Sequence, residues 1–200
     1  MRRLLLAVLS CLFMFSITAF AADTTAAGTS NDEDKNIIMV EGVLIEDVSY
    51  PMARNLGGQK HIRTYMYEIE TASDESHTTS DWDDASVCKA YLTIEYSSYD
   101  DANGQPLYVL DRVSGRWTEP TDSAYIVSSK VTYGCTKVED GSQIGERFVS
   151  NNFSFPTNFD EGVSNWGGGT LGANLYLDLQ RGSSSEWTLH LQNLAFGAGF

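Results

Sequence analysis

The sequence predicts an all-β protein, folded as an antiparallel β-sandwich or jelly-roll-like domain of about eight strands. From Ile37 onward, short runs of alternating apolar and polar residues are separated by segments rich in Gly, Asn, Asp and Ser, which is typical of half-buried strands joined by turns. After the first 21 residues there is no apolar repeat with the helical period. Hydrophobic residues make up 42% of the 200 residues and aromatic residues 12%, enough for the core of one domain and too many for a collagen-like or disordered chain.

The predicted strands can be placed in order along the chain. The runs are 38–44, 61–70, 87–96, 107–110, 116–118, 125–133, 147–155, 171–179 and 187–191. In the first two runs, the residues that share an apolar face are Ile38, Val40, Gly42 and Leu44, then Tyr65, Tyr67 and Ile69. The clearest alternation is in the third run, whose apolar face holds Cys88, Ala90, Leu92, Ile94 and Tyr96.

The later runs follow recognisable turns. Asn103-Gly104 precedes the run 107–110 and is the strongest short hairpin signal in the chain. The run 125–133 places Tyr125, Val127, Val131 and Tyr133 on one face. A closing hairpin joins the leucine-rich run 171–179 to 187–191 through a polar loop. The four prolines fall in loops or at strand starts, where a missing N–H breaks no ladder.

The N-terminus predicts export. Residues 1–21 open with two arginines, continue in an apolar run from 4 to 17, and end in Ala-Phe-Ala, the order of a secretory signal peptide. A retained membrane anchor is the alternative, because residues 4–22 carry no charge. Residues 22–36 hold almost no large apolar side chain and predict a flexible linker, which leaves 37–200 as the β domain. We expect a periplasmic, extracellular or cell-surface location.

The charge excludes some partners. There are 27 acids against 13 bases, giving a formal charge of −14 and a pI of about 4.4. Neither nucleic acid nor an anionic membrane surface attracts such a chain. Removing residues 1–21 takes away two arginines and no acid, so the exported form is more acidic still.

Two cysteines, Cys88 and Cys135, remain after the signal peptide. In an oxidising compartment an even pair predicts one disulfide. The alternative is two buried thiols. A metal site is disfavoured because no CxxC motif or paired histidine accompanies the cysteines.

An acidic segment predicts a solvated loop or a calcium site. Residues 68–84 contain seven acids and no Lys or Arg, and they end in Asp81-Trp82-Asp83-Asp84. Calcium takes several oxygen ligands from a loop, which Asp81, Asp83 and Asp84 would supply. A second oxygen-rich turn lies at 100–103. Neither segment has the full spacing of an EF-hand loop.

Three tryptophans are candidate ligand platforms. Trp166 lies in Ser-Asn-Trp-Gly-Gly-Gly, where the glycines permit a tight turn or close approach to a ligand. Trp82 in the acidic segment and Trp117 offer the same flat apolar face to a sugar ring or a partner protein. In β proteins, aromatic residues also serve as core or cross-strand contacts, so that alternative stays open.

These features favour a non-enzymatic, exported binding module of a bacterial-type cell envelope or exterior, with carbohydrate or another envelope protein as its partner. A small eight-stranded outer-membrane β-barrel is the alternative, because the final seven residues, which end in Phe200, resemble the closing signature of that class. Two further alternatives are a structural subunit of a surface assembly and a glycoside hydrolase using acids such as Glu68 and Glu70. No catalytic set is evident, since the chain lacks the Gly-x-Ser-x-Gly elbow.

Overall fold

The structure of the protein is a computed structural model. It describes residues 36–52, 57–70, 87–120, 124–137, 142–181, 183 and 186–199. The predicted signal peptide and residues 22–35 of the predicted linker lie outside this range. Asn36, placed at the end of the linker, instead begins the first strand.

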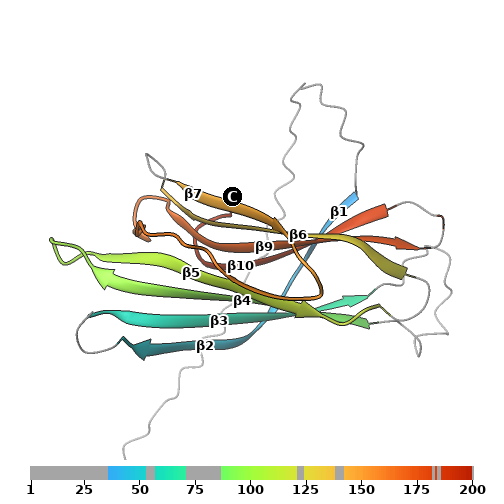
Figure 1. The fold of residues 1–200 in the computed structure, drawn as a ribbon, viewed down its shortest axis with the longest axis horizontal. Coiled ribbons are helices and arrows are strands. Elements are labelled where there is room, and N and C mark those ends of the chain that lie inside the picture. Colours follow the sequence, from blue (N-terminus) through green and yellow to red (C-terminus); the bar gives the residue numbers. More distant parts are fainter. Residues whose placement is uncertain are drawn as a thin grey trace, which may run out of the picture. The chain divides into compact units, whose positions relative to one another are not determined.

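The described residues form ten strands in two sheets (Figure 1). They are β1 (Asn36–Val40), β2 (Val43–Pro51), β3 (Gln59–Glu70), β4 (Val87–Asp100), β5 (Pro106–Trp117), β6 (Ala124–Thr136), β7 (Gln143–Phe148), β8 (Asn152–Pro156), β9 (Thr170–Arg181) and β10 (Glu186–Phe196). Sheet A has the order β1-β10-β9-β6-β7, and sheet B has the order β2-β3-β4-β5-β8. All neighbouring pairs are antiparallel except β1 with β10.

The core lies between the sheets, as the clearest two alternating patterns predicted. Leu171, Leu175 and Leu177 of β9 are fully buried, and they belong to one cluster with Leu92 and Ile94 of β4. Each such aliphatic side chain contributes about 1.5–3 kcal/mol relative to an exposed one. The sandwich prediction is therefore confirmed. The alternative, in which the described strands close into a single barrel with these leucines outside, is wrong.

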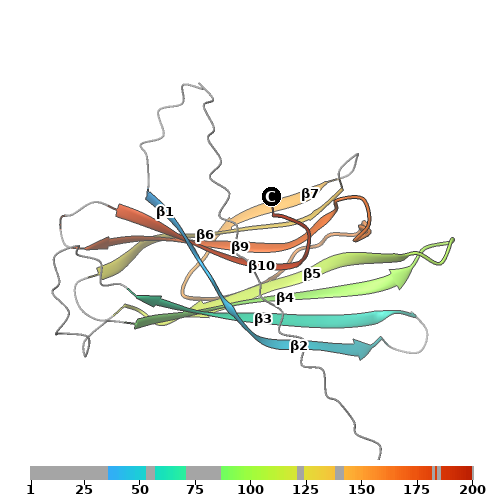
Figure 2. The same cartoon turned by 180° about the vertical axis from the view of Figure 1, so that it is seen from behind.

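The chain crosses from one sheet to the other at two points that the sequence did not reveal. The predicted strand 38–44 is divided at Glu41-Gly42 between β1 of sheet A and β2 of sheet B (Figure 2). The predicted strand 147–155 is divided in the same way by residues 149–151, which connect β7 of sheet A to β8 of sheet B. By contrast, the two short predictions at 107–110 and 116–118 belong to one strand, β5.

A bulge changes the predicted face of β6. The register between β6 and β9 shifts between Ile126 and Ser128, so Val127 is the extra residue of the bulge. Tyr125 and Val127, predicted to share the buried face of Val131, are exposed instead. The bulge lies beside the pocket described below.

Side chains join the two sheets on the β1–β2 side. Arg63 of β3 donates to the carbonyl oxygen of Leu194 over 2.7 Å, and the Tyr67 hydroxyl donates to that of Gln192 over 2.6 Å. In return, Asn193 of β10 donates through Nδ2 to the carbonyl oxygen of Leu92 over 2.7 Å. Burial raises the pKa of Tyr67. These bonds tie β3 and β4 of sheet B to β10 of sheet A.

The predicted disulfide between Cys88 and Cys135 is wrong, because both cysteines are free, buried thiols. The Cys88 Sγ donates to the carbonyl oxygen of Thr118, just past the end of β5, and the Cys135 Sγ to that of Tyr108, near its start. The length of β5 places these carbonyls roughly 30 Å apart, whereas a disulfide needs Cα atoms within about 7 Å. Burial raises the pKa of both thiols.

No helix long and apolar enough to span a membrane occurs in the described part of the chain.

Candidate functional site

Not every predicted site residue falls within the described part. Trp82 and the three proposed calcium ligands Asp81, Asp83 and Asp84 lie outside the described residues. Within the described ranges, no group of three or more acidic, histidine or cysteine side chains could hold a metal ion. Two predicted ligand platforms, Trp117 and Trp166, can be placed.

Trp166 stands alone on an exposed loop. Its side chain is 79% exposed, and its backbone N–H donates to the Ser164 Oγ over 3.1 Å. The next two residues, Gly167 and Gly168, have φ of 82° and 84°, a region that disfavours side chains. The loop leads into Thr170, which pairs with the last residue of β6, Thr136.

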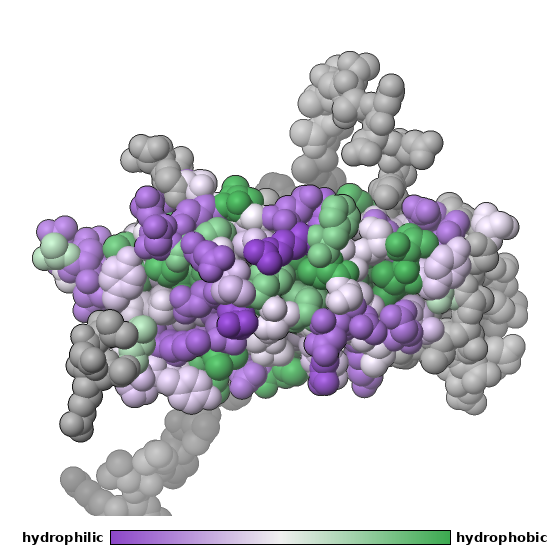
Figure 3. Space-filling view, in the orientation of Figure 1, coloured by the Kyte–Doolittle hydropathy of each residue, from purple (hydrophilic) through white to green (hydrophobic). Residues whose placement is uncertain are grey.

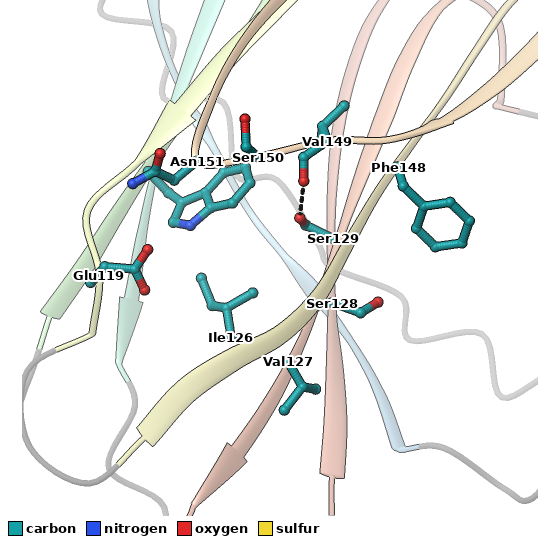
Figure 4. A pocket seen from close by; sticks show the side chains of 10 residues that line it. Glu119, Ile126, Val127, Ser128, Ser129, Phe148, Val149, Ser150 and Asn151 are labelled. Carbon is teal, nitrogen blue, oxygen red and sulfur yellow. Dashed lines mark hydrogen bonds between the residues drawn. The ribbon is translucent and has the colours of Figure 1, made fainter.

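Trp117 lies near the other end of β6, in a pocket at the edge of the sandwich. The pocket has a volume of about 510 Å³. It lies where the end of β5, the start of β6 and the segment from β7 to β8 meet (Figure 4). Its lining residues are Trp117, Glu119, Ile126, Val127, Ser128, Ser129, Phe148, Val149, Ser150 and Asn151. Because β6 extends roughly 3.3 Å per residue, this pocket and the Trp166 loop lie too far apart to form one site.

Backbone and side-chain bonds fix the walls of this pocket, which we call the Trp117 pocket. The Ser129 Oγ donates to the carbonyl oxygen of Val149 over 2.6 Å (Figure 4), and the Val149 N–H donates back to that of Ser129 over 3.1 Å. The backbone N–H of Trp117 donates to the carbonyl oxygen of Asn151 over 3.2 Å. The crossing segment is therefore held to β6 at one end and to β5 at the other. The neighbouring bulge turns Val127 outward, and bulges of this kind re-aim side chains at functional sites.

The Trp117 indole is 7% exposed, and its buried Nε1 has no hydrogen-bond partner. The ring packs into the core, with its centroid 6.4 Å from that of Phe153. A buried donor without an acceptor costs about 1–3 kcal/mol, and buried indole N–H groups usually find a partner. Trp117 is therefore a pocket-lining residue whose indole donor is buried and unsatisfied.

The other lining groups are of mixed character. Glu119 and Asn151 lie on the same side of β6 as Ile126, whereas Phe148 and Ser128 lie on the other side (Figure 4). The Phe148 ring is 77% exposed. The pocket thus offers a carboxylate acceptor, an amide and aliphatic walls, with an exposed aromatic ring at its rim.

Comparison with known proteins finds no matching family model, no matching curated protein and no matching solved structure.

The face of the molecule shown in Figure 3 carries small, separate apolar areas. Hydrophobic residues are interspersed with hydrophilic ones on the face shown in Figure 3, without one continuous apolar patch.

The second oxygen-rich turn has a structural role. The Asp101 carboxylate accepts the backbone N–H groups of Asn103 and Gln105, each over 2.8 Å. The bond from Gln105, followed by that from Asn103, lowers the pKa of Asp101 below its ordinary value. The turn closes the hairpin between β4 and β5, and its carboxylate is occupied by the backbone.

One acid considered for hydrolysis also has a structural partner. The Glu68 carboxylate forms an ion pair with Lys89 on the neighbouring strand, with an N–O distance of 3.0 Å. Both side chains are exposed. The cross-strand register of β3 and β4 accounts for this pair.

Sequence reasoning selected Trp117 but missed the residues around it. The pocket is formed by a bulge and a crossing segment, both of which lay inside runs that the pattern assigned to single strands. The signal that was available is the loss of alternation at Ser128-Ser129 and at Ser150-Asn151. Interrupted alternation marks bulges and strand ends.

Proposed function

We propose that this protein is an exported, non-enzymatic binding module and that the Trp117 pocket holds an uncharged, hydroxyl-rich ligand of the saccharide class. One observation carries the proposal: Trp117 lines an open pocket, and its buried indole Nε1 has no hydrogen-bond partner. A sugar hydroxyl accepts from this N–H and donates to the Glu119 carboxylate, so both groups gain a partner. The apolar face of the sugar ring can contact Ile126 or Phe148.

Charge favours a neutral ligand. The chain has a formal charge of −14, and Glu119 is the charged residue among those that line the pocket. An anionic ligand would meet repulsion from both. Hydroxyl groups avoid this repulsion while still providing donors and acceptors.

The test is to titrate the purified protein with soluble oligosaccharides of several linkage types and to measure binding by isothermal titration calorimetry. The variant Trp117→Phe keeps an aromatic ring but removes the N–H, and we expect it to lose about tenfold or more in affinity. The matched control Trp166→Phe should bind like the wild type. Absence of binding to every saccharide tested, or equal losses in the two variants, would contradict the proposal.

A second candidate function, a structural subunit of a surface assembly, is favoured by the apolar residues of β1 and β2. Both are edge strands, and edge strands can pair with another chain. Of the thirteen large hydrophobic side chains that are exposed among the described residues, seven lie here. They are Ile37, Ile38, Met39, Val43, Leu44, Ile45 and Tyr50.

For this second candidate the occupant is a second copy of the chain. Sedimentation velocity over a range of concentrations tests it. We expect self-association that is abolished by Ile37→Lys or Val43→Lys, because each places a charge on the exposed edge. A monomer at every concentration would exclude the assembly.

A further inference from the structure

A trough crosses the outer face of sheet B. It has a volume of about 480 Å³, and it lies on the side of the sheet facing away from the core. Its lining residues are Ile45, Glu46, Thr64, Tyr91, Thr93, Ser114, Gly115, Arg116, Asn152, Phe153 and Ser154. These residues come from all five strands of the sheet.

One row of short polar side chains forms the length of the trough. In the strand registers each member lies opposite the next, and the row is Glu46, Thr64, Thr93, Ser114 and Ser154. The Thr64 Oγ1 donates to the Glu46 carboxylate over 3.1 Å and lies 2.9 Å from the Thr93 Oγ1. Strands lie about 4.8 Å apart, so the row is roughly 20 Å long. That length is far greater than a single sugar ring.

Larger side chains border this row. On one side, the Arg116 guanidinium lies over the Tyr91 ring, 4.6 Å from its centroid. Ile45 is the extra residue where the register of β2 with β3 shifts, and it is exposed beside the row. On the other side lie Glu95 and Arg112, whose charged groups are 3.9 Å apart. The trough therefore combines a hydroxyl floor with one border that holds an aromatic ring, a guanidinium and an aliphatic side chain, and another formed by an ion pair.

The trough and the Trp117 pocket are adjacent. Arg116 lines the trough and the next residue, Trp117, lines the pocket. On the neighbouring segment, Asn152 lines the trough and the preceding residue, Asn151, lines the pocket. Both asparagines are exposed. The edge of sheet B at these two asparagines therefore lies between the Trp117 pocket and the trough.

We propose that the ligand is a chain of several sugar units, with one unit in the Trp117 pocket, the chain passing over Asn151-Asn152, and further units along the trough. This inference rests on the proposed function. The hydroxyl of Ser114 and the amide of Asn152 each supply a donor and an acceptor for the hydroxyls of the chain. The Thr93 hydroxyl supplies an acceptor, because its proton is directed to the Thr64 Oγ1. The additional units bind beside one that is already held, so each contributes at a high effective concentration.

The test compares a disaccharide with a hexasaccharide of the same linkage by calorimetry, using gluco-, xylo- and manno-oligosaccharides as probes. We expect the hexasaccharide to bind about tenfold more tightly or better. Ser114→Tyr, which places a bulky ring in the middle of the trough, should reduce hexasaccharide affinity to that of the disaccharide without changing disaccharide binding. Asn152→Ala should act in the same direction, and the matched loop variant Asn165→Ala should have no effect.

The outcomes separate this inference from the proposed function. Equal affinity for the two lengths, or a Ser114→Tyr variant with unchanged hexasaccharide affinity, overturns the chain-binding inference while the pocket proposal stands. Absence of binding to either length overturns both. Circular dichroism of each variant shows that the fold is retained, and Asn152→Ala gives an independent result if Ser114→Tyr fails to fold.

Discussion

Trp117 and Trp166 were selected by the same reasoning, yet they lie in opposite environments. Trp166 is 79% exposed at the tip of a glycine-rich loop, whereas Trp117 is 7% exposed and lines a pocket. The exposed Trp166 ring presents its surface to solvent. Trp117 packs against core residues such as Phe153, and its indole N–H has no hydrogen-bond partner. The comparison teaches that exposure and unsatisfied hydrogen-bonding groups single out different tryptophans: exposure selects Trp166, and the unpartnered indole donor selects Trp117.

The largest expected effect concerns the thiols at the two ends of β5. Cys88 lies near the Trp117 end and Cys135 near the Trp166 end, and both should be protected from maleimide labelling by orders of magnitude because they are buried with a raised pKa. Peptide mapping by mass spectrometry should find both labelled after denaturation without a reductant. If the cysteines could be labelled only after reduction, they would be joined in a disulfide, which would contradict their placement near opposite ends of β5.

The next effect is on stability. Trp117→Ala should lower the free energy of unfolding by about 3–5 kcal/mol, because it removes a core ring. Trp166→Ala should change it by less than about 0.5 kcal/mol, as surface substitutions do. Urea denaturation of the two variants measures the difference. Similar losses of unfolding free energy in both variants would contradict the placement of Trp117 in the core and of Trp166 on the surface.

The smallest effect is a pH dependence from the Trp166 half of the sandwich. His61 stacks on Tyr96 with ring centroids 4.7 Å apart and is bonded to Ser49 and Ser98. Burial lowers its pKa from 6.5, against an opposing influence of Asp47. The unfolded chain therefore binds the proton more readily, and stability is lost as the pH falls below about 6.5.

The variant His61→Gln isolates this contribution, because it cannot titrate. We expect its unfolding free energy to decline less between neutral pH and pH about 5 than that of the wild type. His190, whose pKa is also lowered by burial, contributes in the same direction and remains in the variant. Identical pH profiles for the two proteins would show that His61 has no part in the effect.

The fold class was predictable because strand alternation is local. The inward faces of Leu171–Leu179 and of Cys88–Tyr96 follow directly from a period of two residues. The crossing at Glu41-Gly42 was not predictable, because a strand that changes sheets there keeps its alternation and only its partners change. The crossing at 149–151 does interrupt the alternation, but an interruption does not say which sheet the next strand joins. The Cys88–Cys135 disulfide was wrong for the same reason: inward orientation was correct, but position along the sandwich depends on pairing.

Only part of the candidate site was predictable. Trp117 could be chosen from its residue type, but its unpartnered Nε1 is a property of the packed pocket. The trough of sheet B depends on the register of five strands, which places Thr93 opposite Ser114. No periodicity within one strand reveals such a row, because register is fixed by tertiary pairing.

The most direct test of the account follows the indole N–H groups by nuclear magnetic resonance during titration with a hexasaccharide. The chain has four tryptophans, and the variants Trp117→Phe and Trp166→Phe assign their signals. We predict that the Nε1–H signal of Trp117 shifts saturably as it gains an acceptor, while that of Trp166 stays in place. A Trp117 signal that does not move at saturating ligand, or a shift confined to Trp166, would contradict the account.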